Sequence, residues 1–137
     1  MGLGKTIQTI ALIAYLMEVK RNMGPYLVVV PLSTLSNWKD EFQRWAPDIQ
    51  LVVYLGAPQA RNDLWMEKVK PGKFNVLLST FDFVLRDKAK LSSISWNFLV
   101  MDEGHRIKNS NSALSVALKS YRPKHRLLLT GTPLQNK

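Results

Sequence analysis

Two kinds of segment alternate along the 137-residue chain. Short, nearly continuous apolar runs are typical of parallel strands that are covered on both faces. We expect such strands at 26–30, 51–55, 74–78, 96–101 and 126–129. Between them, apolar residues recur at helical spacing, which predicts helices at 4–21, 33–45, 58–70 and 112–120. This order predicts an α/β fold, a mostly parallel central sheet with helices on both faces.

Two of the expected helices carry strong apolar patterns. In segment 33–45, Leu35, Trp38, Phe42 and Trp45 share one face, so we expect both tryptophans in the core. In segment 4–21 both faces carry apolar residues, which predicts a helix buried on more than one side.

Charge and residue composition limit the kinds of binding partner and metal ion that we expect. The chain has 19 Lys and Arg against 10 Asp and Glu, a net charge of +9, which favours phosphate-rich partners. The absence of cysteine excludes disulfides, thiolate metal sites and thiol nucleophiles. Any metal is then expected to be a hard, oxygen-liganded ion such as magnesium. No apolar run reaches the roughly 18 residues of a membrane span, so no membrane partner is expected.

The first segment combines glycine, a cation and a hydroxyl. Gly2-Leu3-Gly4-Lys5-Thr6 matches the end of a P-loop, whose first glycine would fall before Met1. A glycine-rich turn that leads into a helix directs backbone amides and the positive end of the helix dipole at an anion. Lys5 can then bridge terminal phosphates and Thr6 can ligate magnesium. The alternative is a flexible start to a buried helix.

An acidic pair follows the fourth apolar run. Asp102 and Glu103 can divide their work, with Asp102 holding magnesium and Glu103 deprotonating the attacking water. An isolated pair of this kind is more often two solvated acids. The order of the two motifs, a loop and helix followed by an acidic strand end, favours a P-loop nucleotide hydrolase.

Four stretches of the chain together resemble a known family. Segment 2–6 with Gln8, and segments 31–38, 102–109 and 129–136, are similar to helicase motifs I, Ia, II and III of Swi/Snf-type chromatin-remodelling ATPases. The D-E-G-H form of motif II is closest to the Brahma-like catalytic subunits. The resemblance implies a RecA-like first lobe of a superfamily-two translocase, with ATP and Mg²⁺ as cofactors. It implies nuclear localisation, and as partners double-stranded DNA, nucleosomes and the subunits of a remodelling complex.

The resemblance also implies roles for residues of the nucleotide site. Residues 2–6 bind the nucleotide, with Lys5 on the ATP phosphates. Thr6 and Asp102 serve magnesium, and Glu103 activates water. His105 couples the nucleotide site to motif III, which here is Thr130, Gly131 and Thr132. His125 has no such context and is expected at the surface.

Motifs Ia and Ib of the family face the DNA backbone. The residues that match them, together with a lysine of motif II, are Ser33, Asn37, Thr80, Phe81 and Lys108. Ser33, Ser36 and Thr80 can also act as helix caps, which is the expected task of at least one of them. Further cations can add nonspecific attraction without base readout: Arg86, Lys88, Lys90, Arg106, Lys108, Arg122 and Lys124.

The family's motor has two lobes, and residues 1–137 correspond to part of the first. We expect Met1 to be an internal methionine of a longer motor or a misplaced start. The second lobe and its arginine fingers are absent, and such a finger is worth about 10³ to 10⁵ in rate. This piece alone is therefore expected to hydrolyse ATP hardly at all. The alternatives are a noncatalytic lobe that binds DNA or a partner, and an RNA helicase lobe. Any interpretation of the chain as part of a motor requires Lys5 and Asp102 to lie close together at one nucleotide site.

Overall fold

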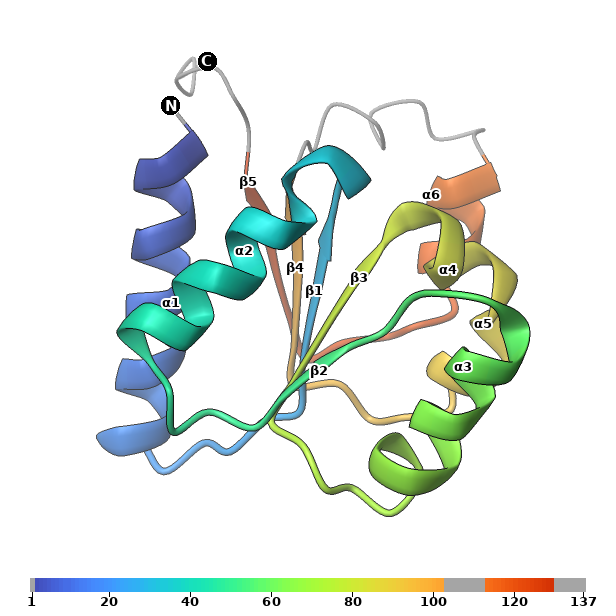
Figure 1. Cartoon of the computed structure of the whole chain (residues 1–137), viewed down its shortest axis with the longest axis horizontal. Coiled ribbons are helices and arrows are strands. Elements are labelled where there is room, and N and C mark those ends of the chain that lie inside the picture. Colours follow the sequence, from blue (N-terminus) through green and yellow to red (C-terminus); the bar gives the residue numbers. More distant parts are fainter. Residues whose placement is uncertain (1, 103–112, 130–137) are drawn as a thin grey trace.

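The computed structural model is a parallel sheet between two layers of helices (Figure 1). The structure describes residues 2–102 and 113–129 of the chain. Within these residues, the sheet has five strands in the order β2-β3-β1-β4-β5, and each neighbouring pair is parallel. The strands are β1 (Tyr26–Val30), β2 (Leu51–Val53), β3 (Val76–Thr80), β4 (Phe98–Asp102) and β5 (His125–Leu129). The predicted α/β class is confirmed.

Helices cover both faces of the sheet, as expected. One face carries α1 (Gly2–Glu18) and α2 (Leu32–Trp45), whose apolar residues pack with alternate residues of β1. Side chains from the other layer pack on the opposite face. That layer consists of α3 (Pro58–Leu64), the π-helical turn η1 (Trp65–Val69), α4 (Phe81–Arg86), α5 (Lys88–Leu91) and α6 (Ala113–Leu118). None of the described helices is long and apolar enough to cross a membrane.

Strands β3 and β4 begin and end later in the sequence than predicted, and each ends on a polar residue. They end at Thr80 and Asp102 rather than at 78 and 101. Polar side chains can occupy buried strand ends when they are hydrogen-bonded. The Ser79 hydroxyl donates to the Tyr54 carbonyl at 2.6 Å. The apolar residue Phe74 precedes β3 and packs on Trp96, with ring centroids 5.9 Å apart.

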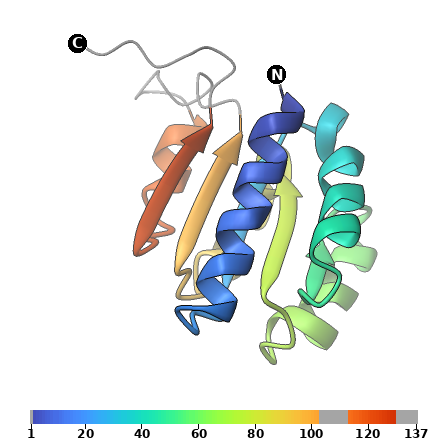
Figure 2. The ribbon, with the colours of Figure 1, turned by 90° about the vertical axis from the view of Figure 1, so that its left-hand side faces the viewer.

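Helix α1 is buried on one side, so the prediction of burial on several sides is wrong. Ile10 and Ile13 are each 1% exposed and face the sheet. Leu12 and Tyr15, by contrast, are 37% and 47% exposed. Figure 2 shows α1 as an outer layer in front of the strands. No described element packs over its outward side, which leaves those apolar residues in contact with solvent.

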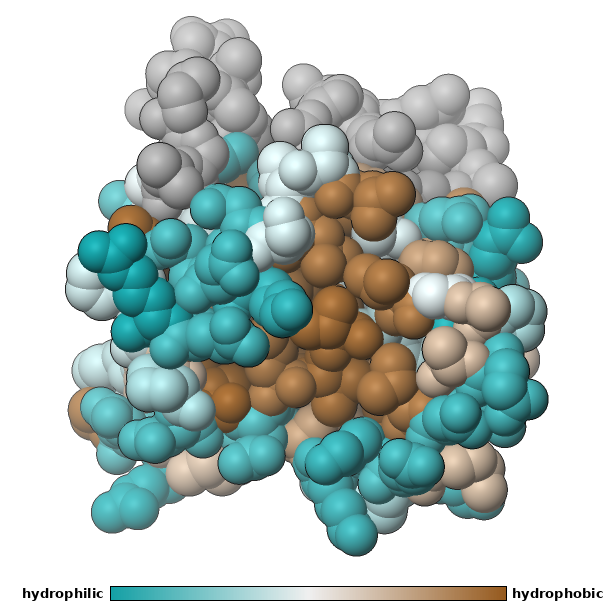
Figure 3. Space-filling view, in the orientation of Figure 1, coloured by the Kyte–Doolittle hydropathy of each residue, from teal (hydrophilic) through white to brown (hydrophobic). Residues whose placement is uncertain are grey.

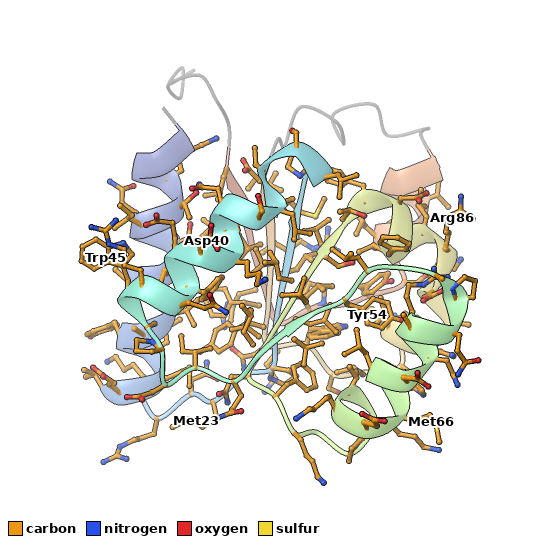
Figure 4. All side chains as sticks on the ribbon, in the orientation of Figure 1. Met23, Asp40, Trp45, Tyr54, Met66 and Arg86 are labelled. Carbon is orange, nitrogen blue, oxygen red and sulfur yellow. The ribbon has the colours of Figure 1, made fainter. Side chains whose placement is uncertain are left out.

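The two tryptophans of α2 have different environments. Trp38 is in the core, at 1% exposure, but Trp45 is 53% exposed, so the prediction that both are buried is wrong for Trp45. Trp45 is the last residue of α2, and Figure 4 shows it at the outer side of that helix. Its indole donates to Glu41 at 2.7 Å, and the Arg44 guanidinium lies 5.1 Å from its ring centroid. Helical spacing thus located the apolar face but not the point at which the sheet stops covering it.

The edge strand β2 borders an apolar surface. Figure 3 shows hydrophobic side chains in the middle of the view, where β2 crosses the front of the molecule. Half-buried residues from β2 and the adjoining segments belong to the same core cluster: Ile49, Leu51, Val53 and Leu55.

The turn before β1 requires glycine at position 24. Gly24 has a φ of +97°, and an added Cβ would lie 2.7 Å from Tyr26 Cδ1 and 2.9 Å from the Asn75 carbonyl oxygen. We expect Gly24→Ala to lower the free energy of unfolding by about 1–3 kcal/mol, as measured by denaturant titration. Gly72→Ala is the matched control, because Gly72 also has a positive φ of +77° but no atom within 4 Å of the added Cβ. Equal losses in the two variants would show that the steric contact is unimportant.

Candidate nucleotide site and nucleic-acid interface

The carboxyl ends of the parallel strands lie along one edge of the sheet. The register pairs Val30 of β1 with Thr80 of β3, and Asp102 of β4 with Leu129 of β5. Figure 1 shows that the first turn of α1 lies at this same edge. In α/β sheets this edge is the usual place for a ligand site. The candidate residues from distant parts of the sequence are therefore brought to one side of the molecule.

Lys5 and Asp102 form the central contact of this edge. The Lys5 ammonium nitrogen lies 3.2 Å from Asp102 Oδ1, although the two residues are 97 positions apart in the sequence. Their side chains are 21% and 9% exposed, so the ion pair is largely shielded from water. The convergence that the motor interpretation required is present.

Trp38 is a second donor to the same carboxylate. Its indole Nε1 lies 3.4 Å from Asp102 Oδ2, within the buried layer between α2 and the sheet. A carboxylate at a buried strand end needs such donors to offset its lost hydration. Sequence reasoning placed Trp38 only in the core. The helical spacing of an apolar residue carries no signal for its N–H group, so this contact was missed.

The donor types at this edge fit magnesium. Thr6 follows Lys5 in α1 and is 2% exposed, and Asp102 is 6% exposed. Hydroxyl and carboxylate oxygens are ligands that magnesium accepts. No group of three or more His, Cys, Asp or Glu side chains gathers among the described residues.

The first glycines adopt a different conformation from the expected one. The sequence predicted a glycine-rich turn before a helix that starts at Gly4, whereas α1 already begins at Gly2. Glycine can enter a helix at a cost of about 1 kcal/mol relative to alanine. Among the described residues, no atom lies within 4 Å of a Cβ added at Gly4, and Gly4 itself is exposed.

Some of the predicted DNA-contact residues come together around one hollow. Its lining comes from the segments that follow β1 and β3, and it includes Pro31, Leu32, Ser33, Thr80, Phe81, Asp82 and Phe83. Ser33 is exposed, whereas Thr80 and Phe81 are 5% and 6% exposed. Asn37, one turn further along α2, is half-buried and does not line this hollow.

The capping alternative receives little support at these positions. Thr80 is the N-cap residue of α4, but its side chain makes no capping hydrogen bond. The N-cap residue of α2 is Pro31, so Ser33 and Ser36 both lie inside the helix.

The predicted cations do not form one patch. Arg86 and Lys88 are exposed on α4 and α5. Arg122 and Lys124 are also exposed, but they precede β5, and the Lys124 amide donates to the Trp96 carbonyl at the amino end of β4. Those two residues therefore lie at the opposite edge of the sheet from Asp102. The positions of these cations in the sequence did not indicate that they would lie at different edges of the sheet.

The remaining site predictions fall largely outside the described residues. Glu103, His105, Lys108, Thr130, Gly131 and Thr132 lie there, as does Arg106 of the cation group. For Gly2 and Leu3 the structure describes only their place in α1. His125 is exposed, as expected, and its ring lies 4.8 Å from that of Phe98.

Comparison with known proteins identifies the family. Residues 1–137 match the SNF2-related domain. The ATP-dependent helicase brm of Drosophila melanogaster is 55% identical over 138 residues, which cover 100% of this chain and 8% of that protein. Nuclear protein STH1/NPS1 of Saccharomyces cerevisiae is 51% identical, over 99% of this chain and 10% of that protein. The chain thus spans about a tenth of the length of these relatives.

A solved structure agrees with the fold and with the predicted resemblance. The Sulfolobus solfataricus SWI2/SNF2 ATPase core in complex with dsDNA has a TM-score of 0.84 and 37% sequence identity. The match covers 100% of this chain and 27% of that one. With a parallel sheet, a Lys5–Asp102 contact at its carboxyl edge and a family match along its full length, the chain belongs to the SNF2-related domain family.

Proposed function

We propose that residues 1–137 form part of the first RecA-like lobe of an ATP-dependent DNA translocase that remodels chromatin. The observation that carries this proposal is the 3.2 Å contact between Lys5 and Asp102. The contact supports the proposal because a lysine ammonium beside a shielded carboxylate, at the edge where α/β folds bind ligands, is suited to a magnesium-bound phosphate. A second lobe, supplied from outside these residues, would complete the motor.

The proposed nucleotide roles combine the donor chemistry of this edge with the motifs by which the chain resembles its family. Lys5 binds the terminal phosphates of ATP, helped by backbone amides of Gly2, Leu3 and Gly4 at the positive end of α1. The oxygens of Thr6 and Asp102 would hold magnesium, which would supply positive charge to neutralise the phosphates. Glu103, directly after β4, accepts the proton of the attacking water. His105 and residues 130–132 relay the state of this site to the nucleic acid.

Duplex DNA is the proposed track. The net charge of +9 favours a polyanion, and the solved relative is named as a complex with dsDNA. Ser33, Asn37, Thr80, Phe81 and Lys108 would contact the backbone. A curated relative from Arabidopsis thaliana, 54% identical, is named as a chromatin structure-remodeling complex protein. We therefore propose nucleosomes and the subunits of such a complex as partners, and the nucleus as the location.

ATP hydrolysis by the intact protein that carries these residues tests the proposal. Duplex DNA is expected to stimulate hydrolysis, and RNA of equal length is expected to do so more weakly. We expect Glu103→Gln to lower kcat by about 10²- to 10⁴-fold and to leave ATP binding in place, because it removes only the proton acceptor.

Each other outcome indicates a different function. Stronger stimulation by RNA would indicate an RNA helicase lobe. DNA binding without hydrolysis would indicate a noncatalytic module. Full activity of the Glu103→Gln variant would contradict the assigned base.

A further inference from the structure

A buried polar cluster joins three segments next to the hollow formed by residues 31–33 and 80–83. Arg61 of α3 holds the Asp87 carboxylate through one edge of its guanidinium, at 2.8 Å from Nε to Oδ2 and 3.3 Å from Nη2 to Oδ1. Its Nη1 donates to the Gly56 carbonyl at 2.7 Å. The Tyr54 hydroxyl donates to the same carboxylate. Figure 4 shows Tyr54 beside the segment that leads from β2 toward α3.

The charge states of this cluster are well defined. Burial opposes ionisation of Asp87, but the hydrogen bonds from Arg61 and Tyr54 outweigh it and hold the pKa of Asp87 below its ordinary value. Burial, and next the hydrogen bond to Asp87, raise the pKa of Tyr54 far above its ordinary value. At neutral pH the carboxylate therefore accepts and the phenol donates. The cluster has one fixed hydrogen-bond pattern.

The cluster controls a helix that has little stability of its own. α4 has six residues, and its N-cap side chain makes no capping hydrogen bond. Helices of this length depend on tertiary contacts. Asp87 ends α4, since its amide donates to the Phe83 carbonyl at 2.9 Å, and its own carbonyl accepts from Leu91 of α5 at 2.9 Å. The Arg61 guanidinium also lies 4.7 Å from the centroid of the Phe83 ring.

Phe83 connects this cluster to the candidate DNA interface. It lines the hollow that also contains Ser33, Thr80 and Phe81. We propose that Arg61 and Asp87 are positioning residues for DNA binding: they hold α4 and Phe83 so that this hollow keeps the shape that receives the DNA backbone. Arg61 is only 9% exposed, so it acts through Phe83 rather than by contact with phosphate. This inference rests on the proposed function.

The positioning role of Arg61 and Asp87 rests on the geometry of their contact rather than on the free energy that the ion pair contributes. A buried ion pair gives little net stability compared with well-packed apolar residues, because both charges lose their hydration. A bidentate, stacked guanidinium does fix the orientation of its partners. The Arg61–Asp87 pair is therefore better suited to orienting α4 than to raising the stability of the fold.

Titration of ATP hydrolysis with duplex DNA tests the inference in the intact protein. Arg61→Lys keeps the charge but loses the bidentate contact and the planar stacking on Phe83. We expect it to raise the DNA concentration for half-maximal stimulation by roughly three- to tenfold. The KM for ATP and the rate without DNA should be unchanged. Gln59→Ala is the matched control on α3, because the side chain of Gln59 is exposed and donates to Asp63 on the same helix.

Asp87→Asn distinguishes positioning from simple electrostatics. This variant makes the protein more positive, so a charge effect alone would tighten DNA binding. Positioning predicts weaker binding. Tyr54→Phe, which removes a single hydroxyl, gives a milder form of the same test if Asp87→Asn unfolds the protein.

The outcomes separate this inference from the proposed function. Unchanged half-saturation in Arg61→Lys and Tyr54→Phe, with a wild type that DNA stimulates, would overturn only the positioning role. A parallel change in the KM for ATP would also overturn it, since the cluster would then be merely structural. A wild type that DNA does not stimulate would overturn the proposed function and this inference with it.

Discussion

Lys5→Ala is expected to lower kcat/KM for ATP hydrolysis by about 10²- to 10³-fold in the intact protein, measured by phosphate release at saturating duplex DNA. The reason is the position of the ammonium group, 3.2 Å from Asp102 at the carboxyl edge of the sheet. There it can stabilise the negative charge that the phosphoryl group carries in the transition state.

A loss of stability must be separated from this loss of chemistry. Lys5→Ala removes the partner of a carboxylate whose side chain is 9% exposed, and breaking a buried pair is destabilising. The double variant Lys5→Ala, Asp102→Asn also removes the negative charge of Asp102. We expect the unfolding midpoint of the double variant to return most of the way to that of the wild type, and its ATP hydrolysis to stay as low as that of Lys5→Ala.

Lys20→Ala is the control for the loss of a positive charge. Lys20 is exposed and lies just beyond the other end of α1. We expect its kcat/KM to equal that of the wild type. A Lys5→Ala variant that is equally active would rule out the nucleotide site described here.

The sequence predicted the sheet because its strands have an unambiguous composition. Segment 26–30 is a continuous apolar run, and all five of its residues are buried in β1. Helices α4 and α5 escaped prediction because six and four residues are too short to show a helical period. The exact ends of β3 and β4 also escaped it, because each strand finishes on a buried polar residue, Thr80 or Asp102.

The candidate site was predictable where a motif fixes both residue type and order. Lys5 and Asp102 were named from such motifs, and the structure brings them together, while their roles stay predictions. The Arg61–Asp87 pair was not predictable, because its members are 26 positions apart and resemble ordinary surface charges in the sequence. Trp38 was assigned to the core correctly, but its contact with Asp102 depends on how α2 lies across the sheet.

Trp38→Ala is expected to lower the free energy of unfolding by about 3–5 kcal/mol. Trp38 is 1% exposed, and its ring centroid lies 6.4 Å from that of Phe42 in the layer between α2 and the sheet. Denaturant titration followed by far-ultraviolet circular dichroism measures this loss without depending on tryptophan fluorescence. Trp45→Ala makes the same change on the same helix at a residue that is 53% exposed, and should cost less than about 1 kcal/mol. Equal losses would contradict the burial of Trp38.

Trp38→Phe separates packing from hydrogen bonding at this position. It keeps an aromatic ring in the core but removes the N–H that lies 3.4 Å from Asp102 Oδ2. Because the carboxylate then loses one of its donors, we expect an unfolding cost of about 1–3 kcal/mol and a weaker affinity for Mg²⁺-ATP. Trp45→Phe is the control, since the Trp45 indole donates to Glu41 on the exposed side of α2. Unaltered nucleotide affinity in Trp38→Phe would show that this indole serves the core alone.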